Sequence, residues 1–206
     1  MNEIILTIGH STHPLNHFIA LLRKHQVTAL CDVRSQPYSR RNPQFNRESL
    51  KESLRESGIV YLFLGEALGG RSKDPSCIID GKVHYDLIAQ SSLFRKGLER
   101  LREEMKHHQL ALMCAEKNPI VCHRTILVAR HLDAMGITVK HILEDGSAMA
   151  QIDIIARLIR QLNLPEFDMF RSQEDIIHDA YRIQGERIAY EENDRPDKSA
   201  GPTTRA

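Results

Sequence analysis

The 206-residue sequence contains no tryptophan, and aromatic residues make up only 5% of it. A core of this chain must therefore consist mainly of Leu, Ile, Val and Ala. No apolar run approaches the roughly 18 residues that a membrane-spanning helix needs. The N-terminus also lacks the basic region and long apolar stretch of a secretory leader. We therefore expect a cytoplasmic protein with no membrane partner.

The sequence also has few cysteines and little net charge. In a chain of this length without a leader, four cysteines favour reduced thiols over a disulfide framework. The formal net charge is +1, so a broad electrostatic attraction to nucleic acid is not indicated, although a local basic patch is still open. No GxGxxG motif follows the first predicted strand, and neither GxxxxGKS nor GxxxxGKT occurs. Dinucleotide binding of the Rossmann type and P-loop triphosphate binding are therefore not expected.

Five apolar runs rich in Leu, Ile and Val predict β-strands over residues 4–8, 27–33, 59–64, 110–114 and 137–143. Segments with helical spacing of apolar residues lie between them, and two more follow the last strand. Strands that alternate with helices favour a parallel sheet, and continuous apolar runs are typical of strands covered on both faces.

We therefore predict an α/β fold with a roughly five-stranded, mainly parallel sheet, helices on both faces and extra C-terminal helices. The predicted single domain covers residues 1–192, and its last helix runs from about residue 172 to about residue 192. Residues 193–206 are polar and rich in Pro, Asp and Lys, a composition that predicts a disordered tail.

Charged and reactive side chains follow the ends of most predicted strands. In parallel sheets, ligands bind beyond the carboxyl ends of the strands, which meet at one edge. The residues in these positions are Gly9 to Ser11, Asp32 to Arg34, Gly65 and Glu66, Cys114 to Lys117, and Glu144 and Asp145. Solvation alone does not explain so many functional groups along one edge, so we predict that they form one site.

Two cysteines are candidate nucleophiles. Cys122 lies at the predicted start of a helix, two residues before Arg124. Unsatisfied helix N–H groups and a nearby cation both stabilise a thiolate, which lowers the pKa of the thiol and makes it more reactive at neutral pH. Cys114 ends a predicted core strand. For both cysteines the alternative is a small buried residue that only fills space.

General acid–base catalysis needs a further titratable group near the nucleophile. Glu66 and Glu116 are the candidates, together with His10, whose usual pKa is closest to neutral. His10, His123 and the two cysteines could instead bind zinc, since Zn²⁺ takes thiolate and imidazole ligands. No CxxC or HxxxH spacing supports a zinc site, so we predict no metal and leave the cofactor open.

Six basic residues near the predicted strand ends could bind an anion. They are Arg34, Arg40, Arg41, Arg71, Lys117 and Arg124. Arginine would do so through paired hydrogen bonds to a phosphate or carboxylate. Tyr38 and Phe45 flank the adjacent arginines of this group, which would allow a nucleotide base to stack on them. The alternative is internal pairing with Asp32, Glu66 and Glu116, but these carboxylates are fewer than the cations, so we favour an anion site.

Four motifs stand out in the sequence: TIGHST near the start, CDVRSQPYSRR after the second predicted strand, LGEALGGR after the third and CAEKNPIVCHR after the fourth. In this order they resemble the family catalogued as domain of unknown function 488. The resemblance covers roughly residues 1–145. It implies a bacterial-type cytosolic protein whose motif residues share one site, and it implies no particular activity.

A weaker similarity is to rhodanese and cysteine-phosphatase domains, which also combine an Asp-Val-Arg strand end with a cysteine loop closed by an arginine. In those domains the spacing of cysteine and arginine lets the backbone N–H groups between them surround an anion. Cys114 precedes Arg124 by ten positions and Cys122 precedes it by two. Neither spacing builds such a loop, so their mechanisms do not carry over.

The sequence therefore supports two functional hypotheses. The first is an enzyme that acts on an anionic substrate, a nucleotide or nucleic-acid component, with a cysteine nucleophile and arginines that hold the anion. The second is a non-catalytic module that binds nucleotide or nucleic acid through the same arginines, with structural or redox-sensing cysteines. A homo-oligomer is also open, because the apolar residues of the last predicted helix could pack on a second copy.

Overall fold

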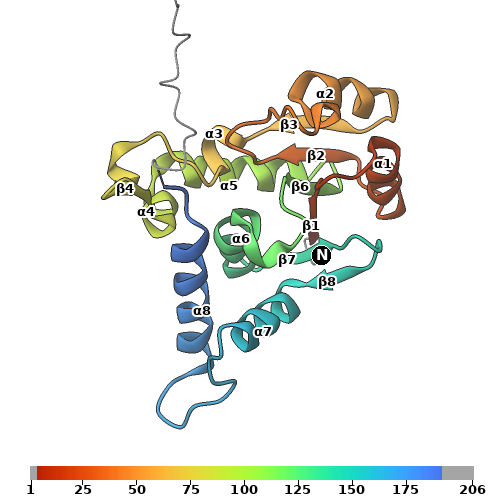
Figure 1. Cartoon of the computed structure of the whole chain (residues 1–206). Helices are drawn as coiled ribbons and strands as arrows, with labels where there is room; N and C mark the ends of the chain where they lie inside the picture. The colour runs from red at the N-terminus through yellow and green to blue at the C-terminus, as the bar shows by residue number, and fades with distance from the viewer. Residues whose placement is uncertain (1–3, 192–206) are drawn as a thin grey trace, which may run out of the picture.

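The computed structural model describes residues 4–191, which form a central six-stranded sheet (Figure 1). The strand order is β3-β2-β6-β1-β7-β8. The strands are β1 (Ile4–Gly9), β2 (Ala29–Asp32), β3 (Val60–Phe63), β6 (Leu110–Cys114), β7 (Thr138–Ile142) and β8 (Ala148–Ala150). All neighbours are parallel except β8, which runs antiparallel to β7. The predicted α/β class with a mainly parallel sheet is confirmed, whereas the predicted tail lies outside the described residues.

The sixth strand was missed because it is too short to form an apolar run. It has three residues, Ala-Met-Ala, and joins the sheet through a tight turn. Asp145 Oδ1 accepts a hydrogen bond from the Ser147 N–H (2.8 Å), and Gly146 has a φ of +76°. Glycine adopts this left-handed backbone conformation without the steric cost of a side chain. The tight turn, rather than a hydrophobic pattern, therefore places β8 at the edge of the sheet.

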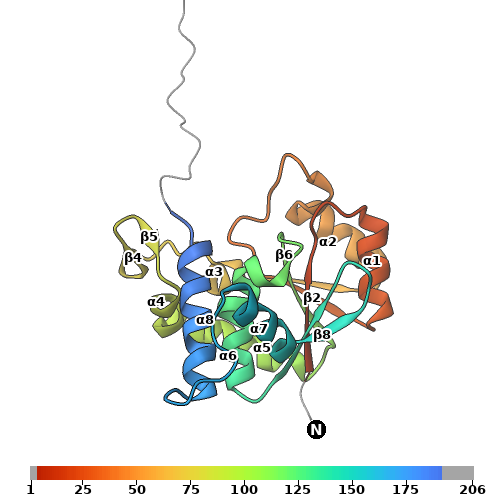
Figure 2. The same cartoon turned by 60° about the horizontal axis from the view of Figure 1, so that its bottom comes forward.

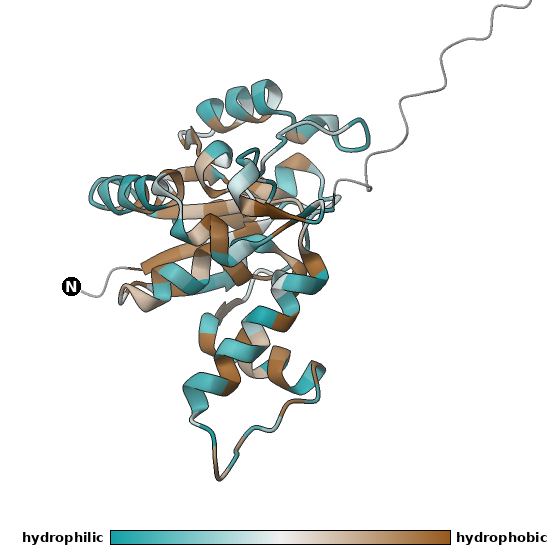
Figure 3. Cartoon of the chain, turned by 90° about the vertical axis from the view of Figure 1, so that its left-hand side faces the viewer, coloured by the Kyte–Doolittle hydropathy of each residue, from teal (hydrophilic) through white to brown (hydrophobic). Residues whose placement is uncertain are grey.

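Helices cover both faces of the sheet (Figure 2). One face carries α1 (Leu15–Lys24) and α2 (Arg47–Glu56), and the other carries α4 (Tyr85–Gln90), α5 (Ser92–Met105), the π-helical η4 (Arg124–Ala129) and α6 (Arg130–Ala134). Figure 3 shows the sheet as the most hydrophobic part of the described chain, with the helices more polar on their outer sides. No helix within residues 4–191 has the length and apolar composition needed to cross a membrane.

The central strand β6 is buried along its whole length. Successive side chains of a strand point to opposite faces of the sheet. Ala111 and Met113 pack with α1 and α2, whereas Leu112 and Cys114 pack with α5 and α6. This alternation directs the Cys114 side chain to the face that also carries Cys122.

The connection between β3 and α4 is structured. It contains α3 (Gly65–Leu68), the short helix η2 (Pro75–Cys77) and the hairpin of β4 (Ile78–Ile79) and β5 (Lys82–Val83). The chain returns to this hairpin after the last helix, where the Val83 N–H donates a hydrogen bond to the Tyr190 carbonyl (3.0 Å). Lys82 pairs with Glu191 through an isolated β-bridge and an ion pair of 2.7 Å.

Two C-terminal helices, α7 (Gln151–Gln161) and α8 (Gln173–Ile188), pack together beside β7. A capping box begins α8, since the Ser172 side chain accepts a hydrogen bond from the Asp175 N–H and the Asp175 side chain accepts one from the Ser172 N–H. Helix α8 ends at Ile188, before the predicted end near residue 192. Ala189 is extended, with a ψ of 140°, because the following residues pair with β5.

A buried chain of polar groups ties α7 and α8 to the sheet. The Thr7 hydroxyl lies 2.8 Å from His141 Nδ1, and His141 Nε2 bonds Gln151 Oε1. The Gln151 amide donates to the Tyr181 hydroxyl (2.8 Å). Since Gln151 Oε1 only accepts hydrogen bonds, His141 carries its hydrogen on Nε2 and is satisfied as a neutral ring.

Gly9 allows the end of β1 to touch the loop after β6. A Cβ atom at this position would lie 1.9 Å from the carbonyl oxygen of Glu116. The same oxygen accepts a 2.6 Å hydrogen bond from Arg124 Nη1. Because Gly9 has no side chain, β1, the loop after β6 and η4 can pack in direct contact.

Gly9→Ala should lower the free energy of unfolding by about 2 kcal/mol or more, because the new Cβ must displace backbone atoms rather than a flexible side chain. Urea unfolding of the full chain measures this change. Gly185→Ala is the matched control, since its Cβ would meet nothing closer than 3.5 Å and alanine favours a helix. If Gly9→Ala is as stable as the unchanged protein, the close contact between β1 and this loop is wrong.

His141 should make the protein less stable as the pH falls from about 6.5 to about 4. Burial lowers the pKa of folded His141 to about 4, whereas the unfolded side chain takes up a proton near pH 6.5. Proton uptake in this window therefore favours the unfolded state, by about 3 kcal/mol when complete.

Urea unfolding at several pH values measures this effect as the slope of the unfolding free energy against pH. His141→Asn should give a shallower slope between pH 6.5 and 4. His107→Asn, at an exposed position after α5, should keep the original slope. An unchanged slope in His141→Asn would contradict the prediction.

Candidate functional site

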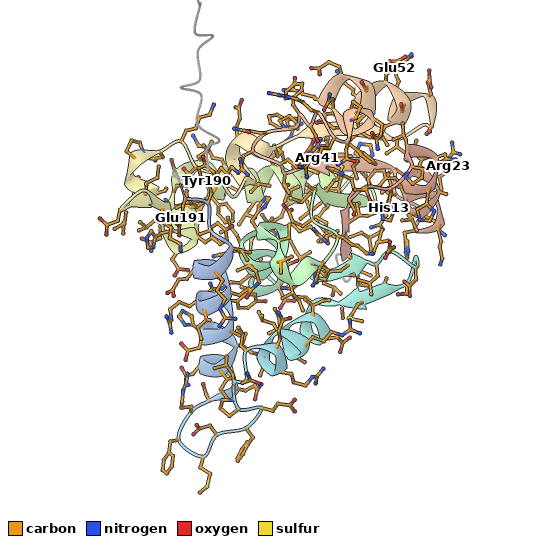
Figure 4. The ribbon with its side chains drawn as sticks, viewed as in Figure 1. His13, Arg23, Arg41, Glu52, Tyr190 and Glu191 are labelled. Carbon is orange, nitrogen blue, oxygen red and sulfur yellow. The ribbon has the colours of Figure 1, made fainter. Side chains whose placement is uncertain are left out.

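A cavity of about 240 Å³ opens beyond the carboxyl ends of β2 and β6. The side chains that matter for its chemistry come from several elements and are Arg34, Arg71, Tyr85, Cys114, Glu116 and His123. The end of α8 and the two residues after it form a further wall. In Figure 4, the labelled Tyr190 marks this wall, and the labelled Glu191 follows it beside the β4–β5 hairpin.

Two thiols, a carboxylate and an imidazole meet beside this cavity. The Cys114 thiol donates to Glu116 Oε2 (2.9 Å), and the Cys122 thiol donates to the same oxygen (3.2 Å). The Cys114 sulfur lies 3.6 Å from His123 Nδ1. We call Cys114, Glu116, Cys122 and His123 the Cys–Glu–His cluster. Among the four, Cys122 does not line the cavity, so Cys114 is the more accessible thiol.

The chain between the two cysteines turns sharply to bring them together. The Asn118 side chain accepts a hydrogen bond from the Ile120 N–H and caps the short helix η3 (Pro119–Val121). Cys122 is then extended, and its carbonyl accepts hydrogen bonds from the Thr125 and Ile126 N–H groups. The π-helical η4 follows, a form of helix that is rare and frequently found at functional sites.

Arg124 connects η4 to the loop after β6, next to the Cys–Glu–His cluster. Its side chain is fully buried, with Nη1 donating to the Glu116 carbonyl (2.6 Å) and Nη2 to the Lys117 carbonyl (3.3 Å). Its Nε has no hydrogen-bond partner among the described residues. Arg124 forms no ion pair with a carboxylate in residues 4–191, so its positive charge acts on the nearby sulfurs.

The two thiols differ in their electrostatic surroundings. Burial alone would raise the pKa of Cys122, but the neighbouring Cys114 thiol and the positive charges of Arg124 and His123 outweigh it and hold this pKa well below its usual value. Burial raises the pKa of Cys114 well above its usual value, and the hydrogen bond to Cys122 adds to the rise. The pair therefore loses its first proton from Cys122 and keeps the second on Cys114.

The negative charge of Cys122 raises the pKa of both His123 and Glu116. Burial would lower the pKa of His123, yet its hydrogen bond with Cys122 and the charges of Cys122 and Glu116 raise it. Withdrawal of the Glu116 carboxyl from water raises its pKa, and the charge of Cys122 raises it further. The Glu116 residue as a whole is exposed, although its Oε2 contacts both sulfurs. The cluster can therefore hold and exchange protons at the edge of the cavity.

Arg34 lines the cavity but is already paired. Its Nε and Nη2 donate to the two carboxylate oxygens of Asp32 (2.9 and 2.6 Å), and Nη2 also donates to the Phe45 carbonyl (2.8 Å). The Tyr61 hydroxyl donates to Asp32 as well (2.7 Å). This network corresponds to the internal pairing that the sequence left open for its arginines.

The His10 side chain belongs to the Arg34 network and not to the Cys–Glu–His cluster. Its Nε2 accepts from Arg34 Nη1 (3.1 Å), and its Nδ1 donates to the Ser11 carbonyl (2.8 Å). Burial and the charge of Arg34 lower the pKa of His10 to about 4. His10 is therefore a neutral, fully bonded ring, and the structure does not bring it to the thiols.

Five other predicted site residues lie away from the cavity. Arg40, Arg41 and Tyr38 are exposed in the loop between β2 and α2, Glu66 is exposed on α3, and Lys117 pairs with Glu144. Figure 4 shows Arg41 well apart from Tyr190. The Tyr38 hydroxyl donates to Glu48 (2.9 Å). Phe45 is buried and stacked on His10, with ring centroids 4.3 Å apart. The predicted base-stacking surface is therefore not assembled.

Tyr85 and Tyr190 were missing from the predicted set, and His123 was named only as a possible zinc ligand. His123 stands between two candidates in the motif CHR, so the sequence contained a signal for it. Tyr85 lies at the start of one predicted helix and Tyr190 near the end of another, where no local pattern indicates a cavity. The Arg71 guanidinium lies over the Tyr190 ring, 4.5 Å from its centroid. These residues meet only through the pairing of the C-terminal segment with β5.

The family comparison covers most of this site. A family model described as domain of unknown function DUF488 matches residues 14–131, more than half of the chain. The match includes the whole Cys–Glu–His cluster, Arg34, Arg71 and Tyr85, but not the C-terminal wall of the cavity. No curated protein and no solved structure matches the chain. This protein therefore belongs to the DUF488 family.

Proposed function

We propose that this protein is an enzyme that binds a small anionic substrate in the cavity and attacks it with the thiol of Cys114. One observation carries the proposal. Cys114 lines the cavity, and its sulfur lies 2.9 Å from a Glu116 oxygen that can take up its proton. Cys122 loses its proton more readily, but it does not line the cavity, so a substrate there would meet Cys114. Because burial raises the pKa of Cys114, this thiol needs a base in hydrogen-bonding reach to act as a nucleophile, and Glu116 provides one.

The reaction would consist of two successive displacements at one carbon of the substrate. The Cys114 thiol gives its proton to Glu116 Oε2 while the sulfur forms a bond to an electrophilic carbon of the substrate. The bond from this carbon to the leaving group breaks, and Glu116 returns the proton to that group. Water or a second substrate then takes the bound group from the sulfur and restores the thiol.

Arg71 supplies the positive charge for the substrate. Within residues 4–191 its guanidinium forms no ion pair and lies over the Tyr190 ring, whereas the charge of Arg34 is neutralised by Asp32. One unpaired guanidinium favours a substrate with a single phosphate or carboxylate group. The cavity is smaller than the roughly 300–1,000 Å³ of pockets for drug-sized ligands. Its size favours a small molecule, of nucleotide size at most, over a strand of nucleic acid.

Iodoacetate and iodoacetamide test this proposal, because both alkylate thiols but only iodoacetate carries a negative charge. Cys114 should react with both in the native chain, and Cys114→Ser should abolish this reaction. Arg71→Ala should slow iodoacetate roughly fivefold, as expected for the loss of about 1 kcal/mol of attraction. It should slow iodoacetamide by less than about twofold. Peptide mass spectrometry measures the rate at each cysteine.

Arg23→Ala is the matched control, since Arg23 is exposed on α1 and distant from the cavity (Figure 4). It should leave both rates unchanged. If Cys114 reacts only after unfolding, the proposed nucleophile is wrong. If Arg71→Ala slows both reagents equally, Cys114 is reactive but Arg71 does not attract the anion.

A further inference from the structure

The Cys–Glu–His cluster also has the donor atoms of a metal site. We propose that it binds one divalent cation of the zinc type through Cys114 Sγ, Cys122 Sγ, His123 Nδ1 and Glu116 Oε2. This set differs from the zinc set considered from the sequence, because Glu116 takes the place of His10. The inference rests on the proposed function in one respect: the bound metal would block the thiol that attacks the substrate.

The distances within the cluster suit a tetrahedral ion. The donor atoms of Cys114, Cys122 and His123 all lie within 4.8 Å of one another. Bonds of about 2.3 Å from zinc to sulfur and about 2.0 Å to nitrogen give a sulfur–nitrogen separation of roughly 3.5 Å in a tetrahedron. The observed separation between Cys114 Sγ and His123 Nδ1 is 3.6 Å. Glu116 Oε2, at 2.9 and 3.2 Å from the two sulfurs, needs only a small outward shift.

The His123 ring is already oriented as a metal ligand. Its Nε2 lies 3.0 Å from the Val33 carbonyl oxygen, which can only accept a hydrogen bond. Nε2 therefore carries the hydrogen, and in the neutral ring the lone pair of Nδ1 is directed toward the sulfurs. A carbonyl that fixes the second nitrogen in this way is typical of histidines that bind metals.

The charges in this region permit metal binding. Two thiolates and one carboxylate around a divalent ion sum to −1, and the buried Arg124 guanidinium offsets this charge. Arg124 lies against the cluster without an ion pair of its own in residues 4–191. Thiolate and imidazole ligands favour zinc over calcium and magnesium, which prefer oxygen. Cys114, Glu116 and His123 line the cavity, so an ion can reach them from solvent.

Metal titration of the full-length protein, stripped with a chelator, tests the site. Zn²⁺ should bind with a stoichiometry of one per chain in the presence of a competing chelator. Co²⁺ in its place should give the sulfur charge-transfer and strong visible bands of tetrahedral thiolate coordination. Cys122→Ser should weaken Zn²⁺ binding by roughly a hundredfold or more. Cys77→Ser, at a buried cysteine in η2 outside the cluster, should bind as the unchanged protein does.

A second measurement does not depend on the folding of a variant. In the unchanged protein, stoichiometric Zn²⁺ should slow the reaction of iodoacetamide with Cys114 and Cys122 at least tenfold, and a chelator should restore it. If Zn²⁺ does not bind stoichiometrically, or binds equally to Cys122→Ser, the metal site is wrong. If Cys114 then still reacts in the native chain, the proposed enzyme stands without it. If Zn²⁺ binds with the expected spectrum but the metal-free thiols are inert, the metal site stands and the proposed nucleophile is wrong.

Discussion

The arrangement of the site depends on the hydrogen bonds of one buried guanidinium, that of Arg124. Arg124 donates to two consecutive carbonyls of the loop after β6, at Glu116 and Lys117. These bonds tie the end of the central strand to the helix that begins after Cys122. Lysine could not take this role, because its single ammonium lacks two N–H groups fixed in one plane. Without this tie, only the turn through η3 would hold Cys114 and Cys122 against the same carboxylate oxygen.

The two buried arginines of the motifs bond to other groups of the protein and so stabilise the site instead of binding a ligand. Arg34 is neutralised by Asp32, and Arg124 is held by backbone carbonyls. A buried charge is costly unless it is paired or hydrogen-bonded, so such side chains take their internal partners first. Arg71, which is exposed, keeps its charge at the cavity. The number of cationic side chains at the end of a sheet is therefore larger than the number that can bind an anion.

The sequence predicted the main features of the fold and part of the site. Apolar runs gave the five parallel strands, and the rule for ligand binding at strand ends selected Cys114 and Glu116. The partner of each arginine could not be predicted, because Arg34 and Arg41 lie in the same motif and differ only in what surrounds them. The C-terminal wall was also beyond prediction. Tyr190 reaches the cavity by pairing with Val83, more than a hundred positions earlier in the chain.

Glu116 Oε2 is the atom that thiol attack and metal binding would share. As a base it would take the proton of Cys114, and as a ligand it would contact an ion that holds both sulfurs as thiolates. Metal ligation uses the sulfur lone pair that a nucleophile needs, so the two states exclude each other at Cys114. Because three of the four ligands line the cavity, the ion and the substrate would compete for the same space. Free zinc would then act as a reversible inhibitor, and a substrate anion held by Arg71 would favour the metal-free form.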